Sequence, residues 1–280
     1  MLDDKKITII GPGVMAEAII KGLIERAGVS PKMILVSGPR ENRLEELKKN
    51  YGVSATTNNR EAVKGSGIII IAVKPQSVPA ALRDLPGAIP EDALAISIVA
   101  GTTLSDLSKR LGHEAVVRAM PNTPGQIGAG ITVWTATKSV REDQMEQAKS
   151  ILGAMGEEIF VEEEDYLDMA TAVSGTGPSY VYLFMEAMVD AGVHLGFPRR
   201  IAEELVVKTV AGSVAFYDHS PLHLARLRNQ VTSPGGTSAA ALYYLEKAGF
   251  RTALSRAIWA AYERSTQLGK GKKRGEVVDE

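Results

Sequence analysis

Short apolar runs rich in β-branched residues alternate with longer amphipathic stretches along the first half of the chain. Runs of this kind are typical of parallel strands covered by helices on both faces. The alternation therefore predicts a doubly wound α/β sheet. Strands are expected at residues 7–10, 33–36, 67–73, 93–99, 116–120, 131–135 and 158–161.

The second half has a different pattern, which is helical from Asp165 onward, with Pro178 placed to start a long helix. Residues 180–195 are apolar on nearly every face, so a helix there must be buried all round. A short helical segment has little surface of its own for that purpose, which favours burial against a second subunit. We expect an α/β domain at residues 1–163 and an all-α dimerisation and substrate domain at 164–280.

A glycine-rich turn, Gly11-Pro12-Gly13-Val14-Met15-Ala16, follows the first expected strand and opens a helix. In this G-x-G-x-x-A pattern the first glycine permits a tight turn and the second lets a pyrophosphate approach the backbone. Ala16 allows the helix to pack closely on the strand. The context predicts a Rossmann-like domain that binds a dinucleotide through Gly11, Gly13, Val14 and Met15.

The end of the second expected strand bears on the choice of cofactor. Ser37-Gly38-Pro39-Arg40 stands where an NAD enzyme usually carries an acid for the ribose hydroxyls. An acid would repel a 2′-phosphate, whereas a hydroxyl with a nearby arginine would accept one. NADPH is therefore favoured, with NADH as the alternative cofactor. A competing interpretation is that Arg40 only begins a helix whose charged residues, Arg43 among them, form an exposed face.

Three more loops are expected to line the cofactor crevice, because ligands of open parallel sheets lie beyond the carboxyl ends of the strands. They are Ala72-Val73-Lys74-Pro75, Ala100-Gly101 and Pro121-Asn122. Lys74 is expected to lie along the cofactor. Its alternative role, a catalytic base, would require a buried lysine, and this one ends a strand at the mouth of a crevice.

A second glycine turn, Ser233-Pro234-Gly235-Gly236-Thr237-Ser238, precedes a strongly helical run at residues 239–248. The glycines remove side-chain bulk, and the helix N-terminus presents unpaired N–H groups that suit an anion. With two hydroxyls at the same place, the loop is suited to hold a small acid by its carboxylate. The alternative is an ordinary helix N-cap after a Pro-Gly turn.

The composition excludes several kinds of partner and of catalytic chemistry. The 280 residues carry a formal net charge of −1 and no cysteine. This balance gives no basic field for nucleic acid, and the missing thiols exclude disulfides and thiol catalysis. The four histidines show no metal-ligand spacing, so no metal is expected, and hydride transfer by a nicotinamide cofactor carries the chemistry.

The same evidence bears on location. No apolar run approaches the roughly 20 residues that a membrane span needs. The first residues lack the charged-then-apolar layout of a signal peptide. We expect a cytoplasmic protein with a small-molecule substrate, and neither nucleic acid nor membrane as a partner.

Taken together, the motifs resemble one family, the pyrroline-5-carboxylate reductases, over nearly the whole chain. These enzymes catalyse the last step of proline synthesis. The resemblance implies a Rossmann-like domain and a helical domain that interlocks with a partner's in a homodimer, and many members assemble further into decamers. It rests on the opening glycine-rich turn, AVKPQ at 72–76, MPNTP at 120–124, VSGTGPSY at 173–180, DAGV at 190–193 and VTSPGGTS at 231–238.

The resemblance also implies a substrate and a reaction. The substrate would be 1-pyrroline-5-carboxylate, with its carboxylate on the backbone N–H groups of the second glycine turn, and hydride delivery to the imine carbon would give L-proline. Ser238 stands where the family has a threonine that hydrogen-bonds the ring nitrogen, and its side chain lacks the methyl that restricts a threonine rotamer. Glu164 matches an acidic position near the substrate pocket. Ser37, Arg40 and Asn59 correspond to residues at the adenosine end of the cofactor.

These inferences define two sets of candidate residues, with Ser238 as the catalytic candidate. The substrate-binding set is Glu164, Ser233, Gly235, Gly236, Thr237 and Ser238. The cofactor-binding set is Gly11, Gly13, Val14, Met15, Ser37, Arg40, Asn59, Ala72, Val73, Lys74, Pro75, Ala100 and Asn122.

Two other classes of function remain open. A β-hydroxyacid dehydrogenase also joins a Rossmann domain to helices and generally uses a lysine of the helical domain. Lys208 and Lys247 are the candidates here, and neither lies in a glycine-rich context. A non-catalytic NADP-binding sensor is the second alternative, and the intact substrate and cofactor loops argue against it.

Overall fold

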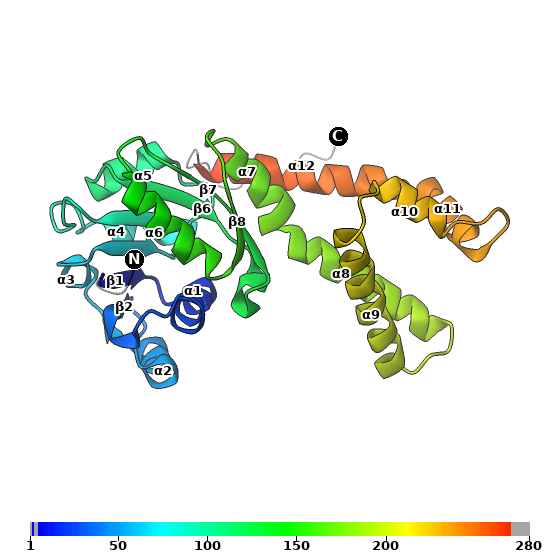
Figure 1. Cartoon of the computed structure of the whole chain (residues 1–280), viewed down its shortest axis with the longest axis horizontal. Helices are drawn as coiled ribbons and strands as arrows, with labels where there is room; N and C mark the ends of the chain where they lie inside the picture. Colours follow the sequence, from blue (N-terminus) through cyan, green and yellow to red (C-terminus); the bar gives the residue numbers. More distant parts are fainter. Residues whose placement is uncertain (1, 3–4, 270–280) are drawn as a thin grey trace. The chain divides into compact units, whose positions relative to one another are not determined.

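A computed structural model describes residue 2 and residues 5–269 (Figure 1). The chain divides into two compact units. We call residues 1–176 with 261–280 the sheet unit, and residues 177–260 the helical unit. The domain boundary expected at 163/164 stays a prediction, and residues 270–280 of the expected helical domain lie outside the described residues.

The sheet unit contains one eight-stranded sheet in the order β3-β2-β1-β4-β5-β6-β7-β8. Neighbouring strands are parallel except β6 and β7. The order reverses between β1 and β4, which is the switch point where doubly wound sheets bind ligands. The strands are β1 (Ile7–Ile10), β2 (Ile34–Ser37), β3 (Ser54–Thr56), β4 (Ile68–Ile71), β5 (Leu94–Ser97), β6 (Val116–Met120), β7 (Gly130–Ala136) and β8 (Gly156–Phe160).

Every strand expected from the sequence is present, and the α/β fold class is confirmed. β3 was missed because it has three residues and pairs only with β2 at the edge of the sheet. β4 is shorter than the apolar run at 67–73, because Ala72 and Val73 leave the sheet and enter the following loop.

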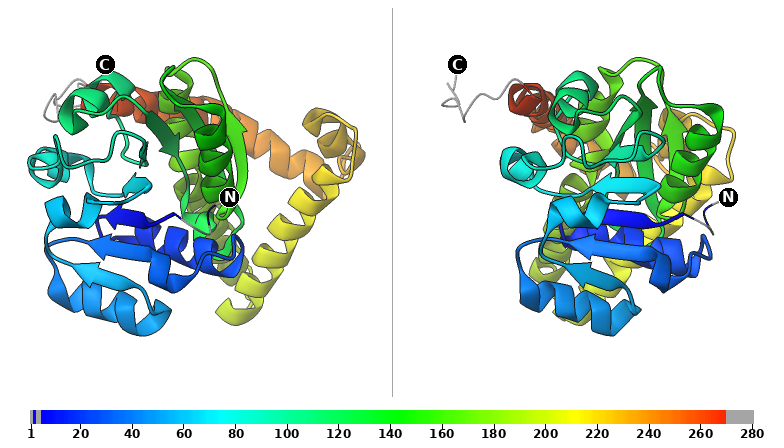
Figure 2. Two further views of the ribbon diagram at one scale, coloured as in Figure 1. Left: turned by 60° about the vertical axis from the view of Figure 1, so that its left-hand side comes forward. Right: turned by 90° about the vertical axis from the view of Figure 1, so that its left-hand side faces the viewer.

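Helices cover both faces of the sheet (Figure 2). Ile68 and Ile70 of β4 belong to one core, and Ile69 and Ile71 belong to the other. This division follows from the alternation of side chains along a strand. One face is covered by α1 (Val14–Glu25), α2 (Glu41–Tyr51) and α6 (Glu142–Gly153), and the other by α3 (Asn59–Val63), α4 (Val78–Leu82) and α5 (Leu104–Leu111).

Trp134 of β7 lies in the first of these cores and is 2% exposed. Its Nε1 donates to Glu158 Oε2 at 2.5 Å, and its ring meets the Phe160 ring edge-on at 4.9 Å between centroids. The buried indole N–H is therefore paired, as burial of such a group requires.

Short 3₁₀ and π-helical turns lie between these elements. Three are 3₁₀ turns, at Pro31–Met33, Pro75–Ser77 and Thr123–Ile127. After α7 (Tyr166–Ala170) a π-helical turn spans Thr171–Gly175. Its wide bond runs from Thr176 N to Thr171 O at 2.8 Å. π-turns occur mostly as single-turn bulges in α-helical segments and frequently mark functional sites.

The helical unit has only a small core of its own. Among its described residues the buried apolar cluster consists of Val189, Ala202 and Val206, where α8 packs on α9. Gly192 permits this approach, since a Cβ there would lie 3.1 Å from Ala202 Cβ. Its helices are α8 (Gly177–His194), α9 (Arg199–Asp218), α10 (Leu224–Gln230), α11 (Thr237–Lys247) and α12 (Phe250–Gly269), whose residues from 261 onward belong to the sheet unit.

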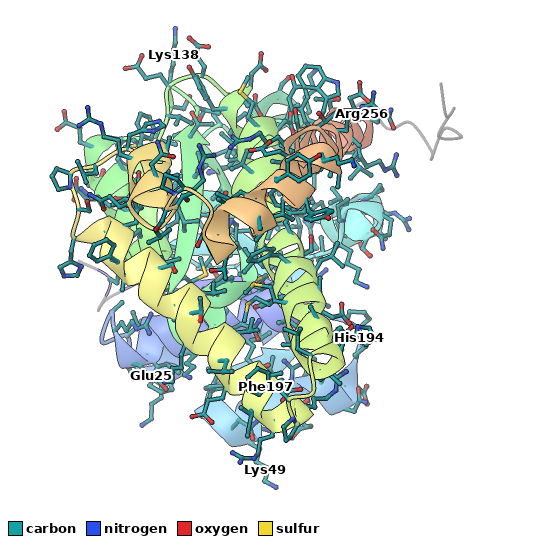
Figure 3. The ribbon with its side chains drawn as sticks, turned by 90° about the vertical axis from the view of Figure 1, so that its right-hand side faces the viewer. Glu25, Lys49, Lys138, His194, Phe197 and Arg256 are labelled. Carbon is teal, nitrogen blue, oxygen red and sulfur yellow. The ribbon has the colours of Figure 1, made fainter. Side chains whose placement is uncertain are left out.

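Large apolar side chains of the helical unit are exposed in the single chain. Leu183 of α8 is 67% exposed and Trp259 of α12 is 62% exposed. Figure 3 shows His194 and Phe197 where the chain passes from α8 to α9. A helix that is apolar on nearly every face and covered on one side needs another surface. Within the described part of the chain, no helix is both long and apolar enough to span a membrane.

Candidate functional site

The glycine-rich turn joins the end of β1 to α1 at the switch point of the sheet. Gly11 has a φ of 103°, a region that favours glycine. A Cβ there would lie 2.8 Å from Ala72 O and 2.7 Å from Val73 Cγ1. Gly13 is the N-cap residue of α1 and has no side-chain acceptor. The first N–H groups of α1 are therefore left for a ligand, as pyrophosphate binding requires.

A cavity of about 600 Å³ opens beside this turn. Its lining comes from the end of β1 and from the segments that follow β1, β2, β3 and β4. Among the described residues that line it, the charged side chains are two cations, Arg40 and Lys74, with no carboxylate. Seven cofactor candidates line the cavity: Gly11, Gly13, Arg40, Asn59, Ala72, Val73 and Lys74.

Arg40 and Asn59 line this cavity, whereas Ser37 lies behind its lining. Ser37 is buried at the end of β2, and its Oγ donates to Asn59 Oδ1 at 2.6 Å. Asn59 Nδ2 donates to Ala81 O at 3.0 Å, so both ends of that amide are fixed. Ser37 therefore positions Asn59. Among the described residues Arg40 makes no ion pair, which leaves its guanidinium available to an anion.

The remaining cofactor candidates lie outside the lining of this cavity. Val14 and Met15 form the first turn of α1, Pro75 follows Lys74 in a 3₁₀ turn, and Ala100 follows β5. Asn122 follows β6, where its Oδ1 accepts from Ile131 N at 3.0 Å and its Nδ2 donates to Ser174 O at 3.3 Å. The Asn122 amide therefore ties β6 to β7 and to the π-helical turn.

The second glycine turn lies in the helical unit and repeats the arrangement of the first. Gly235 has a φ of 72°, and Gly236 is the N-cap residue of α11. Gly236 N donates to Ser233 O at 3.0 Å, which closes the turn. Thr237 and Ser238 are the first two residues of α11, and Ser238 is half-buried. A glycine N-cap again leaves the N–H groups of the first helical turn without a side-chain acceptor.

Glu164 is part of a charge network inside the sheet unit. Its Oε1 accepts from Arg118 Nη1 at 2.9 Å and from Leu104 N, at the start of α5, at 2.7 Å. Arg118 Nη2 pairs with Asp168 Oδ1 at 2.9 Å, and that oxygen also accepts from Ser265 Oγ of α12 at 2.6 Å. Glu164 thus holds α5 and β6 together, and its contact with substrate stays a prediction.

Arg118 was not singled out from the sequence, although its position in an apolar run was a usable signal. It is 3% exposed and interrupts an otherwise apolar strand, Val116–Met120. A charge in such a run must be paired, because burying an isolated ion is very costly. The sequence does not reveal the partner acids, which come from 46 and 50 residues further along the chain.

The doubly wound sheet and the two glycine turns are typical of a nicotinamide-dependent oxidoreductase, and the comparisons with known proteins add a helical dimerisation region. Residues 164–268 match the family model for pyrroline-5-carboxylate reductase dimerisation, and residues 6–101 match the model for NADP oxidoreductase, coenzyme F420-dependent. The pyrroline-5-carboxylate reductase of Synechocystis sp. is 43% identical over 95% of this chain and 98% of its own length. That of Pisum sativum is 35% identical over 95% and 97%.

A solved structure of the same family is also similar to this chain. Plasmodium falciparum pyrroline carboxylate reductase with NADP bound superposes with a TM-score of 0.88 at 32% identity, over 95% of this chain and 99% of the other. The chain belongs to the pyrroline-5-carboxylate reductase family.

Proposed function

We propose that this protein reduces 1-pyrroline-5-carboxylate to L-proline with NADPH, the last step of proline biosynthesis. The observation that carries the proposal is family membership over nearly the full chain, at 43% identity to a curated relative. The two glycine-capped helices fit it, because one suits a pyrophosphate and the other a small carboxylate.

The cavity of the sheet unit is the proposed cofactor site. Gly11, Gly13, Val14 and Met15 would hold the pyrophosphate, and Ser37, Arg40 and Asn59 the adenosine end. Residues 72–75, Ala100 and Asn122 would line the rest of the site. Bound NADPH supplies the hydride. NADPH is favoured over NADH because the cavity is lined by two cations and no carboxylate among the described residues.

The second glycine turn is the proposed substrate site. The N–H groups of residues 235–238 would hold the carboxylate, with Ser233 and Thr237 beside it and Glu164 near the pocket. The Ser238 hydroxyl would hydrogen-bond the ring nitrogen and stabilise the protonated imine. Positioning the imine against the nicotinamide would supply most of the acceleration, since proximity alone contributes roughly 7–11 kcal/mol.

The proposed assembly rests on the exposed apolar helices and on family membership, and the proposed location rests on the sequence. The exposed apolar helices of the helical unit would be covered in a homodimer, and dimers would assemble further into a decamer. We propose a cytoplasmic location, which fractionation of cells that express the native protein would test.

An assay of NADPH absorbance with the cyclic imine tests the reaction. Imine-dependent oxidation with proline as the product is expected, at a higher kcat/KM with NADPH than with NADH. No imine-dependent oxidation would refute the reductase and leave the NADP-binding sensor. Lys208→Met and Lys247→Met should retain the rate, whereas a β-hydroxyacid dehydrogenase would lose it in one of them.

Ser238→Ala tests the proposed role of the hydroxyl. We expect kcat to fall about tenfold, the size of one lost hydrogen bond to a charged group. Ser213→Ala is the matched control, because the Ser213 hydroxyl is exposed on α9 and donates to Thr209 O of the same helix. A kcat unchanged within about twofold would remove Ser238 from the mechanism.

A further inference from the structure

Two arginines converge on one carbonyl oxygen of the glycine-rich turn. Arg40 Nη2 donates to Pro12 O at 3.4 Å, and Arg43 Nε donates to the same oxygen at 3.3 Å. The two guanidinium groups are thus separated by a single acceptor. Only Arg40 also lines the cofactor cavity. The neighbouring Arg43 pairs instead with acidic side chains.

Arg43 is engaged by two carboxylates. Its Nη2 pairs with Glu17 of α1, and its Nη1 pairs with Glu46 of α2 at 2.7 Å. The Arg43 side chain is 17% exposed and that of Glu17 is 29% exposed, so this pair is more sheltered than an ordinary surface ion pair. The Tyr51 hydroxyl donates to the other oxygen of Glu17, Oε1, at 2.8 Å. Both oxygens of Glu17 are therefore occupied.

These contacts keep Glu17 ionised. Burial acts to raise the pKa of Glu17, but the hydrogen bonds from Arg43 and Tyr51 outweigh it and hold that pKa below its usual value. Burial, together with the bond to Glu17, raises the pKa of Tyr51 to about 12. A carboxylate that is ionised at neutral pH therefore stands next to the turn, and Arg43 is the cation that pairs with it.

Without Arg43 that charge would act on the neighbouring site. Arg40 and Arg43 share the Pro12 oxygen, so a Glu17 carboxylate left without Arg43 would attract the Arg40 guanidinium and repel a phosphate that approaches. We infer that Arg43 is a positioning residue for cofactor choice, which holds Glu17 and so leaves Arg40 free to bind the 2′-phosphate of NADPH. This inference rests on the cofactor preference given under the proposed function.

Removal of the guanidinium tests the inference in two ways, by binding and by rate. In Arg43→Met we expect the affinity for 2′,5′-ADP relative to 5′-AMP, measured by calorimetry on the full chain, to fall about tenfold. The NADPH/NADH ratio of kcat/KM should fall by about the same factor, through KM for NADPH and with little change in kcat.

A second substitution identifies Glu17 as the cause. Glu17→Gln in the Arg43→Met background neutralises the more sheltered of the two carboxylates that Arg43 pairs with, and we expect it to restore both ratios to within about threefold of the native protein. Arg43→Lys keeps a cation at the position and should retain most of the preference. Lys48→Met is the matched control, because Lys48 lies on the same helix and pairs with Glu45 at 3.5 Å, away from Glu17.

The outcomes separate this inference from the proposed function. Ratios that are unchanged in Arg43→Met, or a loss that Glu17→Gln does not restore, would overturn the role of Arg43. A native protein that binds 2′,5′-ADP no better than 5′-AMP would overturn it as well. A native protein that binds 2′,5′-ADP but does not reduce the imine would refute the reductase alone, and the binding arm would still test Arg43.

Discussion

The sheet unit and the helical unit solve the burial of apolar side chains in opposite ways. In the sheet unit, Ile68, Ile69, Ile70 and Ile71 are all fully buried, because helices of the same chain cover both faces of β4. In the helical unit, Leu183 is 67% exposed on α8, a helix that is also rich in apolar residues. The difference shows that apolar content alone does not tell whether a segment completes its own core.

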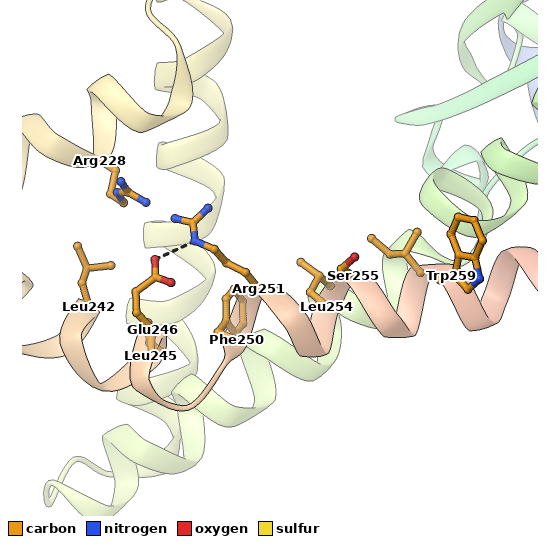
Figure 4. A pocket seen from close by; sticks show the side chains of 10 residues that line it. Arg228, Leu242, Leu245, Glu246, Phe250, Arg251, Leu254, Ser255 and Trp259 are labelled. Carbon is orange, nitrogen blue, oxygen red and sulfur yellow. Dashed lines mark hydrogen bonds and ion pairs between the residues drawn. The ribbon is translucent and has the colours of Figure 1, made fainter. Parts of the chain in front are cut away.

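Each unit has a cavity or groove close to 600 Å³ in volume, and the two differ in the residues that line them. The cavity of the sheet unit has a glycine turn and two cations. The groove of the helical unit is lined mainly by apolar side chains of α11 and α12, among them Leu242, Phe250 and Trp259 (Figure 4). Arg251 and Glu246 pair beside them at 2.8 Å. The first lining suits a nucleotide, and the second suits another protein surface.

The largest expected effect comes from opening the charge network of the sheet unit. Arg118→Met should lower the free energy of unfolding by about 3–5 kcal/mol, because it leaves two carboxylates without their buried counter-charge. Urea denaturation followed by circular dichroism measures it. Arg110→Met is the control, since its pair with Asp106 is exposed and contributes about 0.5 kcal/mol. Equal losses in the two variants would contradict the assigned difference.

A charge on the helical unit should act on assembly more than on folding. Leu183→Asp is expected to weaken self-association by about 2–4 kcal/mol, because it puts a charge on the exposed apolar surface of α8 that a partner would cover. Light scattering would show a smaller mass at the same concentration. Ile127→Asp makes the same change at a 73% exposed position of the sheet unit and should leave the mass unaltered. An unaltered mass in Leu183→Asp would mean that another face is buried.

The smallest expected effect concerns Tyr51, whose pKa of about 12 lies above the ordinary value of 10. Below about pH 10 the tyrosine is protonated in both states, so its contribution is complete. As the pH rises from 10 through 12, only the unfolded state loses the proton, and stability falls by on the order of 1 kcal/mol. Tyr51→Phe should remove this part of the loss, as measured by denaturation at pH 10 and pH 11.5. Identical slopes would refute it.

The sequence predicted the elements better than the contacts between them. Apolar runs such as residues 68–71 carry their own signal, whereas β3, with three residues, carries almost none. The glycine turns were visible because each needs a residue type that few other conformations require. Arg43 was assigned to an exposed charged face, yet its side chain is 17% exposed. Its partner Glu17 lies on another helix, and no local pattern reveals such a pairing.

The chain has two tryptophans, and the structure places one in each unit. Trp134 is enclosed in the core of the sheet unit, while Trp259 lines the open groove of α12. Their emission maxima should differ, with that of the buried Trp134 at a shorter wavelength than that of the exposed Trp259. A single fluorescence spectrum can thus report on the two units separately, with no attached dye.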